Sequence, residues 1–120
     1  LSPHIDALNE RLVRFLEDSG FQVAAMTGLN KLEGIEDLPP AEILDIVVGL
    51  ADRADADGIF VSCTGMRTAT VLDEMERRTG KPVVTALQAT VWHLLGLAGA
   101  PQEVDGRGSL FASKAGIAEA

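Results

Sequence analysis

The sequence predicts an α/β protein with a small parallel sheet and helices on both faces. First, helical and strand-like patterns alternate in the order α-β-α-β-α-β-α, which is typical of parallel sheets because each strand is reached through a crossover. Second, the strand candidates are short apolar runs rather than alternating ones, as expected of strands covered on both faces. Right-handed crossovers then distribute the helices over both faces.

Three apolar runs are predicted to be buried strands. They are Phe21 to Met26, Gly58 to Val61 and Lys81 to Thr85, and each is bounded by glycine, proline or a turn. In open parallel sheets, ligands bind at the carboxyl ends of the strands. The candidate binding region therefore consists of the loops that follow the strands, which are Thr27 to Asn30, Ser62 to Arg67 and Thr85 to Gln88.

Four helices are predicted around these strands, in a small flavodoxin-like layer structure. The first has Ser2 as its cap and Pro3 at its first position, and it ends at Gly20. Its apolar stripe consists of Ile5, Leu8, Leu12, Phe15 and Leu16. Pro39-Pro40 opens the second helix. The third directly follows Cys63 and ends at Gly80, and the fourth contains Trp92 and closes at Gly99 to Pro101.

Composition and charge limit the possible functions. The chain has 120 residues, of which 47% are hydrophobic and 23% are charged, as in soluble globular domains. A net charge of −8 argues against nucleic acid or an anionic membrane as a partner. A single cysteine forms no internal disulfide, which fits a reducing cytoplasm. No apolar run is long enough to span a bilayer.

We expect residues 1–100 to form one α/β domain and residues 101–120 a C-terminal tail that is partly mobile. The chain starts at Leu1 rather than at methionine and enters a helix almost at once. We interpret it as a fragment of a longer protein, and a complete protein released from a tag is the alternative.

Cys63 is the leading candidate for a functional residue. It is the sole cysteine and lies where a predicted strand gives way to a predicted helix, a place where free N–H groups and the helix dipole stabilise a thiolate or a substrate carboxylate. The competing interpretation is a buried, inert cysteine, which is common. Its position in the middle loop at the carboxyl edge of the sheet favours the functional interpretation.

Several familiar sites are absent from the sequence. No G-x-G-x-x-G follows a strand and no G-x-x-x-x-G-K is present, so no dinucleotide or P-loop site is predicted. A cysteine phosphatase loop requires arginine six residues after the cysteine, where this chain has Ala69. His4 and His93 lack metal-ligand spacing, and no metal site is predicted.

Polar residues flank Cys63. Ser62, Thr64 and Thr68 are placed to donate hydroxyl groups to a ligand, or alternatively to cap the next helix. Arg67 could hold a carboxylate or could be a surface residue. The acidic stretch Asp73 to Glu76 is predicted to be a solvated helix face.

Four segments together resemble the second half of the aspartate/glutamate racemase superfamily, in particular its maleate cis–trans isomerase and arylmalonate decarboxylase branch. They are Ser2 to Arg11, Ser62 to Thr68, Lys81 to Thr85 and Gln88 to His93. The resemblance runs from about Ser2 to about Gly99. It implies one half of a two-domain, pseudo-symmetric racemase fold, with the active site between the halves and one cysteine from each.

The resemblance implies that Cys63 is the second-half catalytic cysteine and that no metal or organic cofactor is needed. The implied substrate-binding residues are Ser62, Thr64, Gly65, His4 and Asn30. The family often has tyrosine where this chain has His4. The maleate isomerase branch has an asparagine at about Lys31 or Leu32, next to Asn30.

The sequence therefore predicts an enzyme: a cofactor-independent isomerase, racemase or decarboxylase that acts on a small dicarboxylate or amino-acid-like carboxylate through the Cys63 thiol. The chain alone, without its N-terminal partner half, is expected to be inactive. The alternative is a non-enzymatic flavodoxin-like module that binds a small acid or a protein partner. The apolar last helix around Trp92 further predicts an exposed patch and a homo-oligomer.

Overall fold

The parallel sheet is built from short segments that lie side by side. The computed structural model describes residues 1–113. Strands β1 (Ile59–Val61) and β2 (Val83–Thr85) pair in parallel, with Phe60 opposite Val84. The Leu1 amine donates to the Phe60 carbonyl oxygen (2.8 Å), and the Ser62 N–H donates to the Leu1 carbonyl oxygen (2.9 Å). The amino-terminal residues thus extend the sheet beyond β1.

Ser2 continues the sheet on its other side. It forms an isolated parallel bridge with Gly28, in which the Ser2 N–H donates to Thr27 and the Leu29 N–H donates to Ser2, each at 3.0 Å. The extended segments therefore lie in the order Thr27–Leu29, Leu1–Ser2, β1 and β2.

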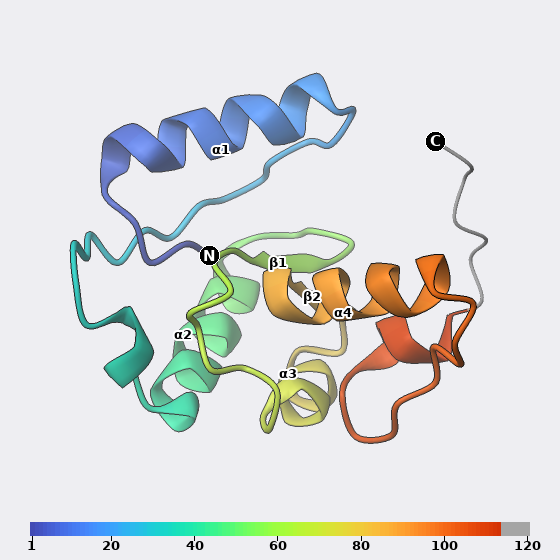
Figure 1. Cartoon of the computed structure of the whole chain (residues 1–120). Coiled ribbons are helices and arrows are strands. Elements are labelled where there is room, and N and C mark those ends of the chain that lie inside the picture. Colours follow the sequence, from blue (N-terminus) through green and yellow to red (C-terminus); the bar gives the residue numbers. More distant parts are fainter. Residues whose placement is uncertain (114–120) are drawn as a thin grey trace.

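Helices cover both sides of these segments. The main helices are α1 (Asp6–Asp18), α2 (Pro40–Arg53), α3 (Leu72–Thr79) and α4 (Ala86–Leu97), and Ile35–Asp37 and Ser109–Ala112 form short 3-10 helices. Figure 1 shows α1 on one side of the strands and α2 and α3 on the other. This arrangement confirms the predicted α/β class with a small parallel sheet.

The hydrophobic core lies between the sheet and the α2–α3 pair. Its buried side chains come from α2, from both strands and from the segment that leads into α3, and include Ile43, Val47, Leu50, Val61, Met66, Leu72, Met75 and Val83. In contrast, α1 buries only Asn9 among its 13 residues. The side of the sheet that faces α1 is therefore packed much less tightly.

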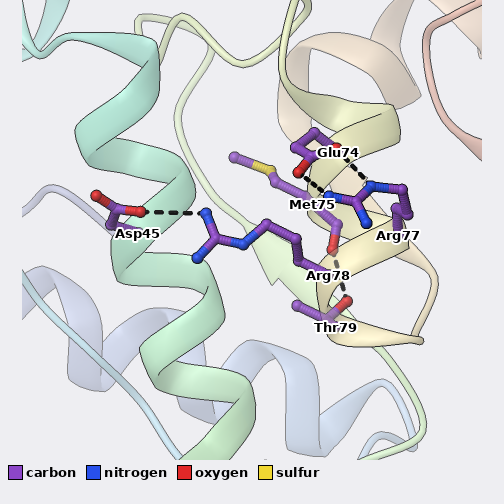
Figure 2. A network of polar contacts seen from close by, with 6 residues as sticks. All are labelled: Asp45, Glu74, Met75, Arg77, Arg78 and Thr79. Atoms are coloured by element: carbon purple, nitrogen blue, oxygen red, sulfur yellow. Dashed lines mark hydrogen bonds and ion pairs between the residues drawn. The ribbon is translucent and has the colours of Figure 1, made fainter.

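Surface charges link α2 to α3 at the rim of this core. Arg78 donates to Asp45 at 3.3 Å across the two helices, and Arg77 pairs with Glu74 within α3 (Figure 2). The hydrogen bond from Arg77 lowers the pKa of the Glu74 carboxyl group and raises that of the arginine. Because these groups are exposed, the pairs contribute little to stability.

Three sequence predictions about local structure are wrong. Helix α1 starts at Asp6 and not at Pro3, because Ser2 is held in the sheet and its hydroxyl accepts the His4 N–H (3.2 Å). Helix α3 starts at Leu72, nine residues after Cys63. Residues 21–26 do not form a strand, because residues 22–26 make no hydrogen bond within the described chain. They are also not buried, and the Phe21 side chain is 66% exposed.

The acidic stretch on α3 is also not simply a solvated face. The Glu76 carboxylate accepts hydrogen bonds from the Val83 N–H (3.0 Å), the Ser109 N–H (2.9 Å) and the Ser109 hydroxyl (2.8 Å). Asp73 accepts the Gly108 N–H at 2.8 Å, and Phe111 is buried. Within the described part of the predicted tail, residues 108–111 are therefore attached to α3 and β2; residues 114–120 lie outside the described chain.

The last helix exposes apolar side chains, as the sequence predicts. Among those facing solvent on α4 are Leu87, Val91, Leu94 and Leu97, the last two being 58% and 65% exposed. None of the helices in residues 1–113 combines the length and the hydropathy needed to cross a membrane.

In the isolated 120-residue chain, burial of the free amine at Leu1 should make the free energy of unfolding depend on pH. Desolvation lowers its pKa from 8.0 to about 6. Between these values the unfolded chain binds more protons than the folded one, so stability is expected to rise from pH 6 to pH 8, by up to about 2–3 kcal/mol. Urea denaturation at pH 5.5, 7 and 8.5 measures the free energy of unfolding at each pH. Chain acetylated at Leu1 is the control, and the same pH dependence in both forms would contradict the prediction.

Glu76→Ala should destabilise the fold by about 1–3 kcal/mol, because it leaves the N–H of buried Val83 without an acceptor and releases Ser109. Thermal unfolding measures the change. Glu74→Ala on the same helix, which removes an exposed pair, is the matched control and should leave the melting temperature almost unchanged. Equal losses in the two variants would show that the Glu76 hydrogen bonds do not stabilise the fold.

Candidate functional site

Cys63 lies in a tight turn just beyond the carboxyl end of β1. The strand ends at Val61, the Ser62 N–H is bound to Leu1, and the Met66 N–H donates to the Cys63 carbonyl oxygen at 3.2 Å. The Met66 side chain is almost completely buried. The turn is therefore fixed on one side by the sheet and on the other by the core.

The backbone of Cys63 is strained. Its φ angle is +80°, and in residues 1–113 Asn30 (φ +53°) is the other non-glycine residue with a positive φ. Asparagine tolerates this conformation, whereas for other L-residues it costs roughly 1–2 kcal/mol. Such strain persists only where the surroundings impose it, and it concentrates at functional sites. Both residues belong to the set that the sequence analysis singles out.

The thiol is half-buried at the margin of the core. Cys63 packs against the core cluster from outside, as does Ile35. A Cβ atom added to Gly65 would lie 3.6 Å from the Cys63 Sγ atom and 3.6 Å from a methyl group of Ile35. The absence of a side chain at Gly65 therefore leaves space beside the sulfur.

The structure brings His4 and Asn30 together. The His4 carbonyl oxygen accepts the Asn30 N–H (3.2 Å) and the Asn9 side-chain amide (2.9 Å). Both residues follow segments that pair at Ser2 and Gly28, so they lie at the same edge of the sheet as the Cys63 turn. The His4 side chain is half-buried and Asn30 is exposed.

Other predicted polar groups have different environments. Thr64 is exposed, Ser62 is half-buried, and the Thr68 hydroxyl is buried without a hydrogen-bond partner in the described chain. Arg67 donates to the Leu38 carbonyl oxygen at 3.1 Å. The nearest helix begins only at Leu72, so the dipole of α3 does not act on Cys63 in the way the sequence analysis assumes.

The polar groups of the predicted loop from Thr85 to Gln88 bond to one another. The Thr85 hydroxyl accepts the Gln88 N–H, and the Gln88 side chain accepts the Thr85 N–H, each at 3.2 Å. The Gln88 amide also donates to Arg107 at 2.7 Å. This capping box uses the polar groups of the loop to start α4, so the groups left for a ligand come from the other two loops.

Sequence reasoning missed Asn9. This buried residue of α1 holds the His4 carbonyl, and a Cβ atom on Gly28 would lie 2.2 Å from its amide nitrogen. A side chain at Gly28 would therefore displace the Asn9 amide from its present position. An amide within a helix, one turn after Ile5 on the apolar stripe, is the signal that could have identified it.

Within residues 1–113, no three His, Cys, Asp or Glu side chains gather in a way that could hold a metal ion. The chemistry that the described residues offer is that of one thiol, flanked by hydroxyl groups, backbone N–H groups and the His4–Asn30 pair. The fold and this site together define an α/β protein with a cysteine at the carboxyl end of a parallel strand.

The chain belongs to the arylmalonate decarboxylase family, whose sequence model matches residues 2–111. The arylmalonate decarboxylase of Bordetella bronchiseptica is 35% identical over 112 residues, which cover 90% of this chain and 47% of that protein. The maleate isomerase of Pseudomonas putida is 30% identical over 114 residues, or 92% of this chain and 45% of that protein. The chain therefore spans about half the length of the curated relatives it matches.

Solved structures agree with this assignment. A double mutant of arylmalonate decarboxylase in its liganded form superposes with a TM-score of 0.86 at 33% identity, covering 92% of this chain and 48% of that one. A maleate isomerase from Pseudomonas putida S16 with maleate gives a TM-score of 0.83 at 23% identity, over 94% of this chain and 46% of that one, and supports the fold alone.

Gly65→Ala should slow alkylation of Cys63 by iodoacetamide severalfold, because the new methyl group would contact the sulfur at ordinary van der Waals distance. The fold should be retained, since Gly65 has no positive φ angle. Mass spectrometry of the native chain measures the rate. Gly49→Ala, whose added Cβ would meet nothing within 4 Å, is the control. A native Cys63 that reacts only after denaturation would contradict the half-buried position.

Proposed function

We propose that this chain is the second half of a cofactor-independent enzyme that acts on a small carboxylate, and that Cys63 is its catalytic thiol in this half. The observation that carries the proposal is the half-buried thiol in a strained turn directly after β1, within the residues that match the arylmalonate decarboxylase family. An inert core cysteine needs no left-handed backbone, so the strain favours a functional role.

The other groups at this edge of the sheet would bind the substrate carboxylate. Thr64 and Gly65 follow the thiol and offer backbone N–H groups, and Ser62 and Thr64 offer hydroxyls. His4 and Asn30 would contribute from the neighbouring loops, which their shared hydrogen bond keeps together. Donors of this kind stabilise the anion that forms when a carboxylate-bearing carbon loses a proton or carbon dioxide.

A cysteine suits both reactions named for the relatives. In decarboxylation, the carbon–carbon bond to one carboxylate breaks, carbon dioxide leaves, and the electron pair remains as an enediolate. The Cys63 thiol then gives its proton to one face of that carbon, and the thiolate regains a proton from water. In cis–trans isomerisation, the thiolate adds to the double bond, the resulting single bond rotates, and elimination restores the thiolate.

The identities of the relatives favour decarboxylation slightly, since the Bordetella bronchiseptica decarboxylase is 35% identical and the Pseudomonas putida isomerase 30%.

We propose that the missing half of the enzyme completes the site, as the coverage of about half of each relative suggests. The exposed apolar residues of α4 are proposed to be covered by that half or by a second copy of the chain. The competing function remains a module that binds a small acid or a protein without turnover.

Cys63→Ala should lower turnover by at least about 10²–10⁴-fold in the full-length protein that contains this chain, because nothing else in this half replaces the thiol. Release of carbon dioxide from an arylmalonate and conversion of maleate are the two assays, and the active one identifies the reaction. Cys63→Gly is the matched control: it also removes the thiol but relieves the positive φ angle.

Both variants should fold and be inactive. Activity in Cys63→Gly would show that turnover does not need the thiol. Saturable binding of the carboxylates by wild-type protein without any turnover would favour the binding module.

A further inference from the structure

Asn9 has an unusual environment for a polar residue of α1. Among the 13 residues of this helix, all of which belong to the described chain, it alone is buried, with 6% of its surface exposed. Apolar residues of the same helix, such as Leu8 and Phe15, are exposed. On an amphipathic helix the polar side chains normally face solvent. The burial of this amide therefore needs a specific reason.

The Asn9 side chain bonds to the backbone of His4. Its amide N–H donates to the His4 carbonyl oxygen at 2.9 Å, and the same oxygen accepts the Asn30 N–H at 3.2 Å. The His4 N–H in turn donates to the Ser2 hydroxyl at 3.2 Å. Both backbone polar groups of His4 are therefore bonded. One oxygen atom connects the two residues that are proposed to bind the substrate carboxylate from this side.

Stability alone does not explain the asparagine. Its side-chain oxygen is buried and has no hydrogen-bond partner within residues 1–113, and an unpaired buried acceptor destabilises a fold. The His4 carbonyl would keep the Asn30 N–H as a donor if the Asn9 amide were removed. The amide is thus unfavourable at its own oxygen and is not needed to satisfy the carbonyl, which points to a role in positioning.

Gly28 leaves the space that the Asn9 amide occupies. A Cβ atom added to Gly28 would lie 2.2 Å from the amide nitrogen and 3.6 Å from the His4 carbonyl oxygen. The first distance is a severe overlap, whereas the second is an ordinary van der Waals contact. The φ angle of Gly28 is not positive, so its backbone conformation suits alanine. Gly28→Ala would therefore act mainly by displacing the Asn9 amide.

We propose that Asn9 is a positioning residue of the carboxylate site, because its amide holds the His4 carbonyl at the point where Asn30 also binds. The inference rests on the proposed function and adds to it a residue that acts through His4. The Cys63 turn is held by other hydrogen bonds. Loss of the Asn9 amide should therefore weaken substrate binding and leave the thiol unchanged.

The first test compares Asn9→Ala with Glu10→Ala in the full-length protein that contains this chain. With whichever of arylmalonate and maleate is turned over, Asn9→Ala should raise KM at least about fivefold and change kcat less than about threefold, because a contact made equally to substrate and transition state acts on KM. Glu10, which is exposed on the same helix, is the matched control, and Glu10→Ala should change neither constant. Cys63 should react with iodoacetamide at the wild-type rate in both variants.

A double-mutant cycle with Gly28→Ala tests the contact itself. Gly28→Ala alone should raise KM about as much as Asn9→Ala. Added to Asn9→Ala, it should raise KM less than about twofold further, because the new methyl group then meets no amide. If the two substitutions acted independently, their effects on KM would multiply, and that result would overturn the proposal.

Unchanged KM in Asn9→Ala would also overturn the positioning role. Slower alkylation of Cys63 together with a fall in kcat, or unfolding of Asn9→Ala in far-UV circular dichroism, would overturn it in favour of a general structural role. Failure of the proposed function is a different result, in which Cys63→Ala keeps turnover or the wild-type protein binds the carboxylates without converting them. In that second case the dissociation constant replaces KM in the same comparisons. Wild-type protein that neither binds nor converts either carboxylate would overturn both proposals.

Discussion

Four hydrogen bonds at Leu1 and Ser2 hold the candidate site together. Leu1 is bonded to Phe60 and Ser62, and Ser2 to Thr27 and Leu29. Cys63 comes one residue after Ser62, and Asn30 comes one residue after Leu29. The two strained residues of the site are thus each adjacent in sequence to one of these bonds. Leu1 and Ser2 are themselves buried, so water does not compete for the bonds, and each lost bond would leave a buried group unpaired.

The sequence allows the fold class and most elements to be predicted. The second helix and the strands that became β1 and β2 follow from apolar runs and from proline and glycine boundaries, which act locally. The errors at Ser2 and at residues 21–26 share one cause. Ser2-Pro3 is a good local signal for a helix start, and residues 21–26 are a good local signal for a strand, but pairing across the sheet decides both. Leu1 pairs with the β1 segment and Ser2 with residues 27–29, whereas residues 22–26 have no pairing partner in the described chain.

The location of the candidate site is predictable, but its internal geometry is not. Cys63 follows an apolar strand, and that is enough to place it at the carboxyl edge of the sheet. The left-handed backbone of Cys63 is invisible in the sequence because nothing local requires it; the Leu1–Ser62 and Cys63–Met66 hydrogen bonds impose it. Similarly, the Glu76 carboxylate accepts hydrogen bonds from Val83 and Ser109, which lie up to 33 positions away in the sequence. The charge pattern alone could not distinguish this carboxylate from that of its exposed neighbour Glu74.

The two sides of the candidate site differ in how firmly they are held. The Cys63 turn lies between Val61 and Met66, whose side chains are almost completely buried. His4 and Asn30, in contrast, belong to segments that continue into α1 and residues 21–26, both of which are largely exposed. Regions with few buried apolar contacts open locally at a lower free-energy cost.

Motion at the site is therefore expected on the His4–Asn30 side rather than at the thiol. Contacts that fixed α1 and residues 22–26 would also fix His4 and Asn30, while the Cys63 turn would change little because the core already holds it. Such contacts would change how tightly a carboxylate is bound more than the reactivity of the sulfur, since the groups proposed to hold the substrate lie on the less firmly packed side.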